Sequence, residues 1–567
     1  MADDGDVRRV ERLSGGLDRA TLVVSAVATL GLIMAVLDTT IVNVALDTLS
    51  RDLGAPLSTI QWVSTGYLLS LASVIPLSGW ITERFGSKRT WIASIALFAI
   101  GSALCATATS AGELIAFRVL QGLGGGMLVP VGFTLVAQSA GPQRIGRALG
   151  LVGVPILLGP IFGPIIGGLI VVNAAWQWIF VVNVPIAVVA IVVAARLLKG
   201  DAGRADAGAL DWVGAALLSP GLAGIVFGLS ETESHGGIDQ PIAFVPIVAG
   251  FALIGLFVWH SLRVERPLID VRLFQSRGFR AATATTFFLG ATLFGTLLVL
   301  PLYYQVDRGQ SALNAGLLLA PQGVGAALML PISGSLTDRI GGGPVVVAGC
   351  SLIALATVPL VFITDHTPFM LLAGVLFVRG LGLGASVQPT TAAAYALLDS
   401  SQVPRATAAL NTLRQIGGSI GTALLAVVLQ HEVTAHVSSA GGAGGLLAPL
   451  SASERDQISG PLATAFGHTF IWAVGTAILA LVAACVLLRS ERAGRAESSP
   501  RAGPSQQAPG RSIASRTVEP GRTVESAEGV VAHTSQSDGT RTPKIPPPSS
   551  VEPSPRSSSR CSATSSG

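Results

Sequence analysis

Long apolar runs recur along this chain at nearly regular intervals, and they restrict its fold more than any other feature. Each is long enough to cross the hydrocarbon core of a bilayer as a helix, which takes about 20 residues. Backbone polar groups in lipid must be paired within the segment, so the runs are expected to be helical. Fourteen runs can be counted, near 22–46, 59–81, 90–109, 112–137, 146–172, 177–198, 211–231, 241–261, 280–304, 312–336, 344–364, 368–397, 405–431 and 466–489.

Composition indicates that lipid surrounds most of the chain. Half of the 567 residues are apolar and 12% are charged, whereas soluble proteins carry charge on roughly 25% of their residues. The mean hydropathy is +0.63, and a single core surrounded by water stops growing well below this length. No C-x-x-C motif occurs, so Cys105, Cys350 and Cys485 are expected to be small packing residues.

Arginine and lysine residues predict the orientation. The even-numbered connections between runs hold fifteen of them and the odd-numbered connections hold three. Both termini are therefore expected in the cytoplasm, in a multi-pass protein of a bacterial cytoplasmic membrane. The first run is too long for a cleaved signal and more spans follow it. Seven tryptophans near the run ends predict an interfacial belt: Trp62, Trp80, Trp91, Trp176, Trp178, Trp212 and Trp259.

Two short motifs occur twice. The sequence GWITERFGSK at 79–88 corresponds to GSLTDRIGGG at 334–343, 255 positions later, and QGLGGG at 121–126 corresponds to RGLGLG at 379–384, 258 positions later. Such internal repeats are typical of secondary transporters, whose substrate sites lie near the midplane between the halves. Two duplicated six-helix halves are therefore expected, with two helices inserted between them.

This repeat predicts five segments. They are a cytoplasmic N-terminal segment (1–21), an N-terminal six-helix bundle (22–198), two inserted helices (211–261), a C-terminal six-helix bundle (280–489) and a cytoplasmic tail (490–567). The tail is rich in Ser, Pro, Gly, Thr and Arg and is expected to be disordered. The longest connection between spans is an outer loop at 432–465.

Six motifs in order give the chain a recognisable pattern. Gly79, Arg84, Gly86 and Lys88 fit a G-x-L-a-D-R-x-G-r-k loop, with Glu83 in place of Asp and Ile81 in place of Leu. The others are LDTTIVNVAL (37–46, followed by Asp47 where Pro is usual), Arg118 with Gln121 and Gly122, the G-P-x-x-G-P-x-x-G-G pattern from Gly159 to Gly168, WQWIFVVNVP (176–185) and RQIGGSIGTAL (414–424).

With these motifs the chain resembles the fourteen-span drug:proton antiporter family of the major facilitator superfamily, over nearly all of residues 20–490. The resemblance implies an all-α integral membrane fold of two six-helix bundles plus two inserted helices. It also implies multidrug or antibiotic efflux driven by the proton-motive force, and it associates the glycine- and proline-rich fifth helix with export.

Asp38 is the expected proton-coupling residue, with Arg118 as its companion. Asp38 lies about eight residues from the outer end of the first span, hence roughly 12 Å deep, and Arg118 lies at about 10 Å. A charged Asp at the midplane costs about 2.5–3.5 kcal/mol, so it needs a partner, water or a proton. Burial disfavours a charged carboxylate, which suits proton coupling. The alternative is a structural pair that holds the first helix against a neighbour.

Further residues are expected to control the conformational change. Gly159, Gly163 and Gly167 recur every four residues, which lets helices approach closely. The motif charges are expected to form a clasp between helix ends at the inner face, although they could equally set the topology alone. The full set is Gly79, Glu83, Arg84, Gly86, Lys88, Asp338, Arg339, Gly159, Pro160, Gly163, Pro164, Gly167 and Gly168.

The substrate cavity is expected to include Asn43, Gln121, Arg379 and Arg414. Beyond Asp38 no Asp or Glu lies deep in any run, which favours neutral, zwitterionic, anionic or singly charged amphipathic substrates. No metal or cofactor is expected, because the proton gradient supplies the energy. The expected partners are the lipid bilayer, protons and small amphipathic molecules rather than nucleic acid, and the protein is expected to be monomeric.

Other functions remain open at this stage. The nearest is a related carrier dedicated to one physiological substrate, such as a lipid, a siderophore or a self-made metabolite. An ATP-driven pump is disfavoured because G-x-x-x-x-G-K-[ST] is absent. An enzyme is disfavoured because no embedded cluster such as H-E-x-x-H occurs. A channel is not excluded, and a sensor or scaffold is a more distant alternative.

Overall fold

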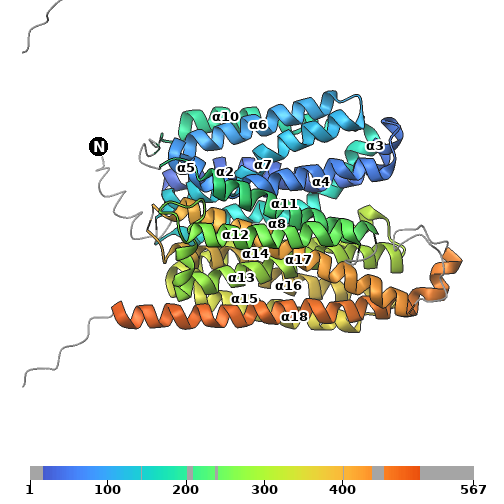
Figure 1. The fold of residues 1–567 in the computed structure, drawn as a ribbon. Coiled ribbons are helices and arrows are strands. Elements are labelled where there is room, and N and C mark those ends of the chain that lie inside the picture. The colour runs from blue at the N-terminus through green and yellow to red at the C-terminus, as the bar shows by residue number, and fades with distance from the viewer. Residues whose placement is uncertain are drawn as a thin grey trace, which may run out of the picture. The chain divides into compact units, whose positions relative to one another are not determined.

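The computed structural model describes residues 17–141, 143–200, 203, 208–235, 240–399, 401–436 and 452–498, and within these ranges it contains helices and no strands (Figure 1). The helices lie side by side along a common direction. The elements are α2 (Arg19–Ile41), η1 (Val42–Ala45), α3 (Leu46–Asp52), α4 (Leu57–Val74), α5 (Leu77–Phe85), α6 (Ser87–Thr107), α7 (Ala111–Ala140), α8 (Ile145–Asn173), α9 (Trp178–Val181), α10 (Asn183–Leu197), α11 (Trp212–His235), α12 (Pro241–Ser261), η2 (Val271–Gln275), α13 (Arg277–Leu302), η3 (Tyr303–Asp307), α14 (Ala312–Ile340), α15 (Gly342–Thr357), η4 (Val358–Phe362), α16 (Phe369–Tyr395), α17 (Val403–His436) and α18 (Ala452–Ser498).

The expectation of an all-helical membrane fold is confirmed. In the described part of the chain, twelve helices are long and apolar enough to cross a membrane. The helices α4 and α5 make a thirteenth if they are counted as one span; they are bent by 56° at a short break that contains Pro76. Proline lacks a backbone N–H and commonly kinks a helix at such a position. Since α8 adds a helix of 29 residues, the structure is compatible with the fourteen expected spans.

Two expected segment boundaries differ from those of the structure. The outer loop expected at 432–465 is helical at both ends, because α17 continues to His436 and α18 already begins at Ala452. The helix α18 also continues past residue 490 to Ser498, through alanine, arginine and glutamate, which favour helix. The rest of the predicted tail (499–567), the middle of the outer loop (437–451) and most of the N-terminal segment (1–16) lie outside the described residues.

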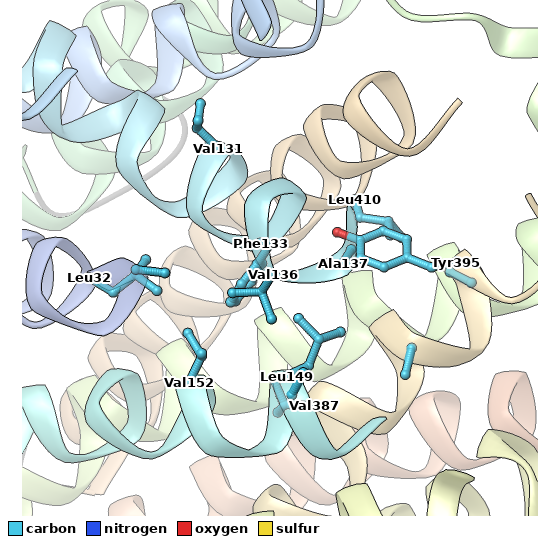
Figure 2. Packing of buried hydrophobic residues seen from close by; sticks show 14 of the residues in the cluster. Leu32, Val131, Phe133, Val136, Ala137, Leu149, Val152, Val387, Tyr395 and Leu410 are labelled. Carbon is cyan, nitrogen blue, oxygen red and sulfur yellow. The ribbon is translucent and has the colours of Figure 1, made fainter. Parts of the chain in front are cut away.

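A large apolar core joins helices from both expected halves (Figure 2). Leu32 of α2, Phe133 of α7 and Leu149 of α8 belong to the same buried cluster as Val387 of α16 and Leu410 of α17. All five side chains are buried. The early helices (α2, α7 and α8) and the late helices (α16 and α17) therefore share one apolar core.

The interfacial role expected for two tryptophans is wrong. Trp91 has no exposed surface and Trp176 is 3% exposed. A Cβ on Gly31 would lie 2.6 Å from the Trp91 ring, and one on Gly132 would lie 3.0 Å from it. The two glycines leave a notch between α2 and α7 in which the ring of Trp91 packs inside the protein.

The inserted helices α11 and α12 pack on each other through close glycine contacts. A Cβ on Gly228 would lie 2.5 Å from the carbonyl oxygen of Ala243, and one on Gly250 would lie 2.6 Å from that of Gly221. The helix α11 also contacts α4 and α17, so an inserted helix touches helices that belong to both expected bundles.

Candidate functional site

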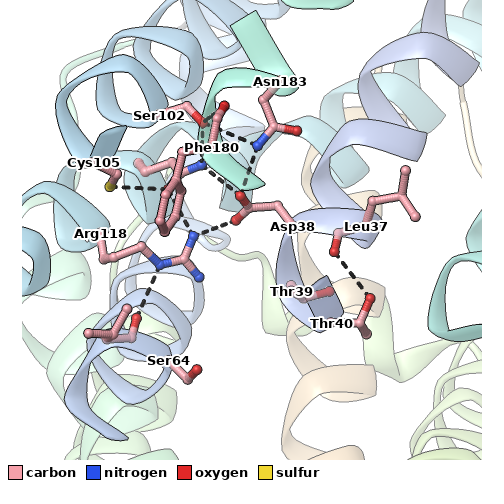
Figure 3. A network of polar contacts seen from close by, with 12 residues as sticks. Leu37, Asp38, Thr39, Thr40, Ser64, Ser102, Cys105, Arg118, Phe180 and Asn183 are labelled. Carbon is pink, nitrogen blue, oxygen red and sulfur yellow. Dashed lines mark hydrogen bonds and ion pairs between the residues drawn. The ribbon is translucent and has the colours of Figure 1, made fainter. Parts of the chain in front are cut away.

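Asp38 lies at the centre of a buried polar network between α2, α6, α7 and α10 (Figure 3). Its side chain has no exposed surface. Arg118 Nη1 donates to Oδ2 of Asp38 at 2.6 Å. Gln121 Nε2 and Asn183 Nδ2 donate to Oδ1 at 2.8 and 3.0 Å. Both carboxylate oxygens are thus paired, as a charge this deep requires.

Arg118 is held by further groups besides the carboxylate. Its Nε donates to the carbonyl oxygen of Val63 at 3.1 Å, and its Nη1 also donates to Gln121 Oε1 at 2.8 Å. The guanidinium carbon lies 4.0 Å from the ring centroid of Tyr67 and 5.7 Å from that of Phe180. Such cation–π contacts stabilise a cation away from water. The structure therefore brings together the two residues that the sequence singled out for proton coupling.

Glycines at two helix contacts, one of them in the repeated motif, allow this network to form. A Cβ on Gly101 of α6 would lie 2.6 Å from the Cα of Gln121, and one on Gly122 would lie 2.6 Å from the carbonyl oxygen of Tyr67. Because no larger residue fits at these contacts, α7 can approach α6 and α4 closely enough for short polar side chains to meet. The motif at 121–126 therefore shapes the site through packing.

A second buried network lies around Arg379, the residue that corresponds to Gln121 in the repeat. Arg379 has no exposed surface. Its Nη2 donates to Thr296 Oγ1 at 2.7 Å and its Nη1 to Gln322 Oε1 at 2.6 Å. Its Nε donates to Thr357 Oγ1 at 3.3 Å.

The two networks share corresponding positions of the repeat. Thr296 follows Asp38 by 258 positions, and Thr357 follows Ser102 by 255 positions. Gln121 donates to Ser102 Oγ at 3.2 Å, as Arg379 does to Thr357. The carboxylate of Asp38 in the first network is thus replaced by the hydroxyl of Thr296 in the second. The amide of Gln121 is replaced by the guanidinium of Arg379.

A cavity of about 560 Å³ lies between the halves. Its walls come from α2, α4, α7, α8, α11, α13, α14, α16 and α17. Two of the expected cavity residues, Asn43 and Arg414, line it. The other two are placed behind its wall: Gln121 belongs to the Asp38 network, and Arg379 is bonded to the lining residue Gln322.

The two motif acids bridge the early and the late helices at one end of the protein. Glu83, at the end of α5, accepts from Arg405 Nη2 at 2.9 Å and from its Nε at 3.0 Å. Asp338, near the end of α14, accepts from the backbone N–H of Gly146 at 2.8 Å, and its Oδ2 lies 3.5 Å from Arg147 Nε. We call these two contacts the paired clasps.

The basic partners in the paired clasps, Arg147 and Arg405, were not predicted. Arg147 and Arg405 are 258 positions apart, so the repeat itself could have identified them. The backbones are close here: a Cβ on Gly79 would lie 3.0 Å from the Cα of Arg405, and one on Gly146 would lie 2.6 Å from the carbonyl oxygen of Gly334.

Other motif residues have local roles. Gly86 ends α5 with φ 87° and, 255 positions later, Gly341 ends α14 with φ 95°, a conformation that strongly favours glycine. Lys88 Nζ donates to the carbonyl oxygens of Ala195 and Leu198 at 2.8 and 2.6 Å, which caps the end of α10. Arg84 and Arg339 lie in the last turns of α5 and α14.

The glycines of the fifth expected span pack against α2. A Cβ on Gly159 would overlap Val36, one on Gly163 would overlap Thr40, and one on Gly167 would lie 2.9 Å from Ile41. A Cβ on Gly168 would meet no atom within 4 Å. Pro160 and Pro164 lie within α8, which is continuous. This glycine face therefore packs against a helix that lines the cavity.

Away from these networks, one group of side chains among the described residues could hold a metal ion. Ligand atoms of Glu432, His436 and His468 lie within 4.8 Å of one another, the first two in the last turn of α17 and His468 further along within α18. Sequence analysis expected no metal ligands, and the spacing gave no signal because His468 lies on a different helix.

Comparisons with known proteins give one consistent family. Residues 28–422 match the model of the Major Facilitator Superfamily. The multidrug resistance protein B homolog of Mycobacterium tuberculosis is 38% identical over 500 residues, which are 84% of this chain and 92% of that protein. The lincomycin resistance protein LmrB of Listeria innocua is 29% identical over 405 residues, 71% of this chain and 86% of that protein. Among solved structures, the proton:xylose symporter XylE has a TM-score of 0.51 and 15% identity, with 80% of this chain and 94% of that chain covered.

Proposed function

The chain belongs to the Major Facilitator Superfamily, and on this premise we propose that it exports amphipathic small molecules, such as drugs or antibiotics, in exchange for protons. The proposal names a drug:proton antiporter driven by the proton-motive force. It involves neither an enzymatic reaction nor a cofactor.

The observation that carries this proposal is the buried Asp38–Arg118 pair. Within the described spans, Asp38 is a carboxylate without exposed surface whose charge depends on one cation and two amides. A proton on Asp38 would neutralise it and weaken its attraction to Arg118. An arginine keeps its proton, so Arg118 would then seek another partner, and helix α7 would be free to shift relative to α2.

The paired clasps supply an element with two states. Glu83–Arg405 and Asp338–Arg147 connect helix ends of the two expected bundles. Their separation would open that end of the protein, so their free energy biases the equilibrium between two conformations. Protonation at Asp38 and opening at the clasps would be coupled through α2, α7 and α8, which pack on one another.

The orientation proposed from the positive charges puts the paired clasps at the cytoplasmic face. Both termini would then be cytoplasmic, in a monomeric protein of a bacterial cytoplasmic membrane. Clasps that are formed close the cytoplasmic end, which is the state in which an exporter releases its substrate.

The relatives support export as the direction of transport. The M. tuberculosis and L. innocua proteins are named for resistance to several drugs and to lincomycin. The matched region covers most of each relative, so the resemblance extends over their spans as well as their motifs. We therefore propose export of such compounds for this chain.

Dye uptake into inverted vesicles tests the proposal, because an exporter carries its substrate into a vesicle whose cytoplasmic face is outside. We expect the native protein to move a lipophilic dye, a protonophore to stop this movement, and Asp38→Asn to abolish it at matched abundance. Asp47→Asn is the control, because Asp47 is exposed and follows Asp38 along the same run of helix. If Asp38→Asn transports as well as the native protein, the proton site lies elsewhere.

The same experiment addresses the dedicated carrier. If the native protein moves no dye from a broad panel yet remains folded, a narrow physiological substrate becomes the better explanation. Asp38→Asn would then be tested with that substrate.

A further inference from the structure

The cavity wall carries positive charge without a described carboxylate. Of its lining residues, Arg414 is the charged one, and none is Asp or Glu. Arg414 is partly exposed, its Nη2 donates to Thr391 Oγ1 at 3.4 Å, and its guanidinium lies 5.9 Å from the ring centroid of Phe133. Its described contacts are therefore weak and neutral, and its face toward the cavity can accept a partner.

Arg379 adds a second positive charge one side chain behind the wall. It is fully buried, and its described hydrogen bonds go to neutral oxygens of threonine and glutamine. Gln322 and Thr296, which hold its guanidinium, both line the cavity. Rotation of Gln322 would expose Nη1 of Arg379 to a ligand.

The repeat explains why this charge has no carboxylate partner. The position that holds Asp38 in the first network holds Thr296 in the second. An arginine in a membrane-spanning segment is costly unless a partner is present, and such residues commonly mark a substrate path. In the first network Arg118 is already paired with Asp38. In the second network Arg379 is bonded to neutral oxygens, and no described side chain there supplies an anion.

The remaining wall is largely apolar. Leu68, Leu71, Ile75, Leu293 and Phe294 line it, together with other aliphatic residues. A ligand that fits both features has an apolar body and an anionic end. A cation would meet Arg414 and Arg379 with no described carboxylate to offset them, which disfavours it.

We propose that the substrates are amphipathic anions whose acidic group pairs with Arg414 and, through displacement of Gln322, with Arg379. This inference rests on the proposed exporter function and restricts its substrates to anions. Arg414 is assigned to substrate binding, and Arg379 supplies the second charge.

Two dyes on one xanthene skeleton test the inference in reconstituted proteoliposomes with an imposed proton gradient. Carboxyfluorescein is the anion and rhodamine 123 is the cation. The native protein is expected to move carboxyfluorescein in preference to rhodamine 123. Arg414→Gln is expected to raise the KM for carboxyfluorescein at least tenfold with little change in kcat, as loss of a binding contact does.

Two matched variants make the test specific. Arg414→Lys keeps the charge and is expected to recover part of the affinity, whereas Arg196→Gln removes an exposed arginine outside the cavity and is expected to leave the KM unchanged. Arg379→Gln is expected to act in the same direction as Arg414→Gln. Binding of carboxyfluorescein to purified protein repeats the comparison without transport.

The outcomes separate the two proposals. Proton-driven movement of rhodamine 123 but not carboxyfluorescein overturns the charge assignment and leaves the exporter standing. An unchanged KM in Arg414→Gln also overturns it. If a proton gradient drives neither of these dyes but drives another lipophilic dye, the charge assignment fails and the exporter stands. If it drives no dye from a broad panel, the result contradicts the proposed function and this inference with it.

Discussion

Arg405 Nη2 lies 2.9 Å from Glu83 Oε2, and this ion pair joins residues that are 322 positions apart in the chain. Both side chains are mostly buried, at 17% and 11% exposed. Arg147 of α8 and Asp338 of α14 form the equivalent contact. Two ion pairs therefore join the early and the late helices at one end of the protein.

Loss of one clasp should impair transport more than stability. Glu83→Gln leaves the size of the side chain unchanged and removes its charge, so the pair with Arg405 weakens and the balance between the two conformations shifts. We expect transport at matched abundance to fall several-fold. The double swap Glu83→Arg with Arg405→Glu should restore part of the loss, and Asp52→Asn, at an exposed acid, should have no effect. Native transport by Glu83→Gln would contradict the role of the clasp.

Removal of Arg118 alone should be more harmful than removal of the whole pair. Arg118→Leu leaves Asp38 buried without its cation, a change that typically costs about 3–5 kcal/mol. The double variant Arg118→Leu with Asp38→Asn should be more stable than Arg118→Leu, since the remaining amides can bond a neutral side chain. Thermal unfolding in detergent measures this, with exposed Arg196→Leu as the control. A double variant less stable than the single one would argue against an unpaired charge as the cause.

Two glycines of one motif should respond oppositely to the same substitution. A Cβ at Gly163 would overlap Thr40, whereas a Cβ at Gly168 would meet no atom within 4 Å. Gly163→Ala is therefore expected to destabilise the protein by about 1–3 kcal/mol, the range for overpacking. Gly168→Ala should be neutral or slightly stabilising, because alanine favours helix. Equal melting temperatures for the two variants would show that α8 does not pack on α2 as described.

The inserted helix α11 should influence transport because it forms part of the cavity wall. Val226 lines the cavity, while Val213 lies on the same helix with 55% of its surface exposed. Val226→Trp should fill part of the cavity and lower the transport of large dyes more than that of small ones. Val213→Trp makes the same change outside the cavity and should leave transport intact. Equal effects of the two changes would exclude α11 from the substrate path.

The spans and the repeat could be predicted because both signals are local in sequence. A run of about 20 apolar residues is sufficient to indicate a helix in lipid. The duplicated motifs gave the register between the halves, and the same register identifies Arg147 and Arg405 as equivalent partners of the motif acids. The pair of Asp38 and Arg118 was predicted from their depths.

The other partners of Asp38 and Arg118 could not be assigned in this way, although Asn183 lies in the motif at 176–185. Asn183 and Tyr67 lie in helices that are apolar on most faces, so periodicity does not indicate which face turns inward. Trp91 was misplaced for a related reason: its place near a helix end suggested an interface, but the notch at Gly31 and Gly132 accommodates it inside the protein. Whether such a side chain is buried depends on how closely the neighbouring helices pack around it, which the sequence of one helix does not show.

The complete burial of Asp38 has a consequence for a cell at rest. A carboxylate without contact to water cannot exchange its proton with either side of the membrane. In this conformation the protein would therefore hold back the proton leak that an open ionisable path would cause. Asp38 could take up or release a proton only after a rearrangement that admits water. Protons would then cross the membrane only during the transport cycle.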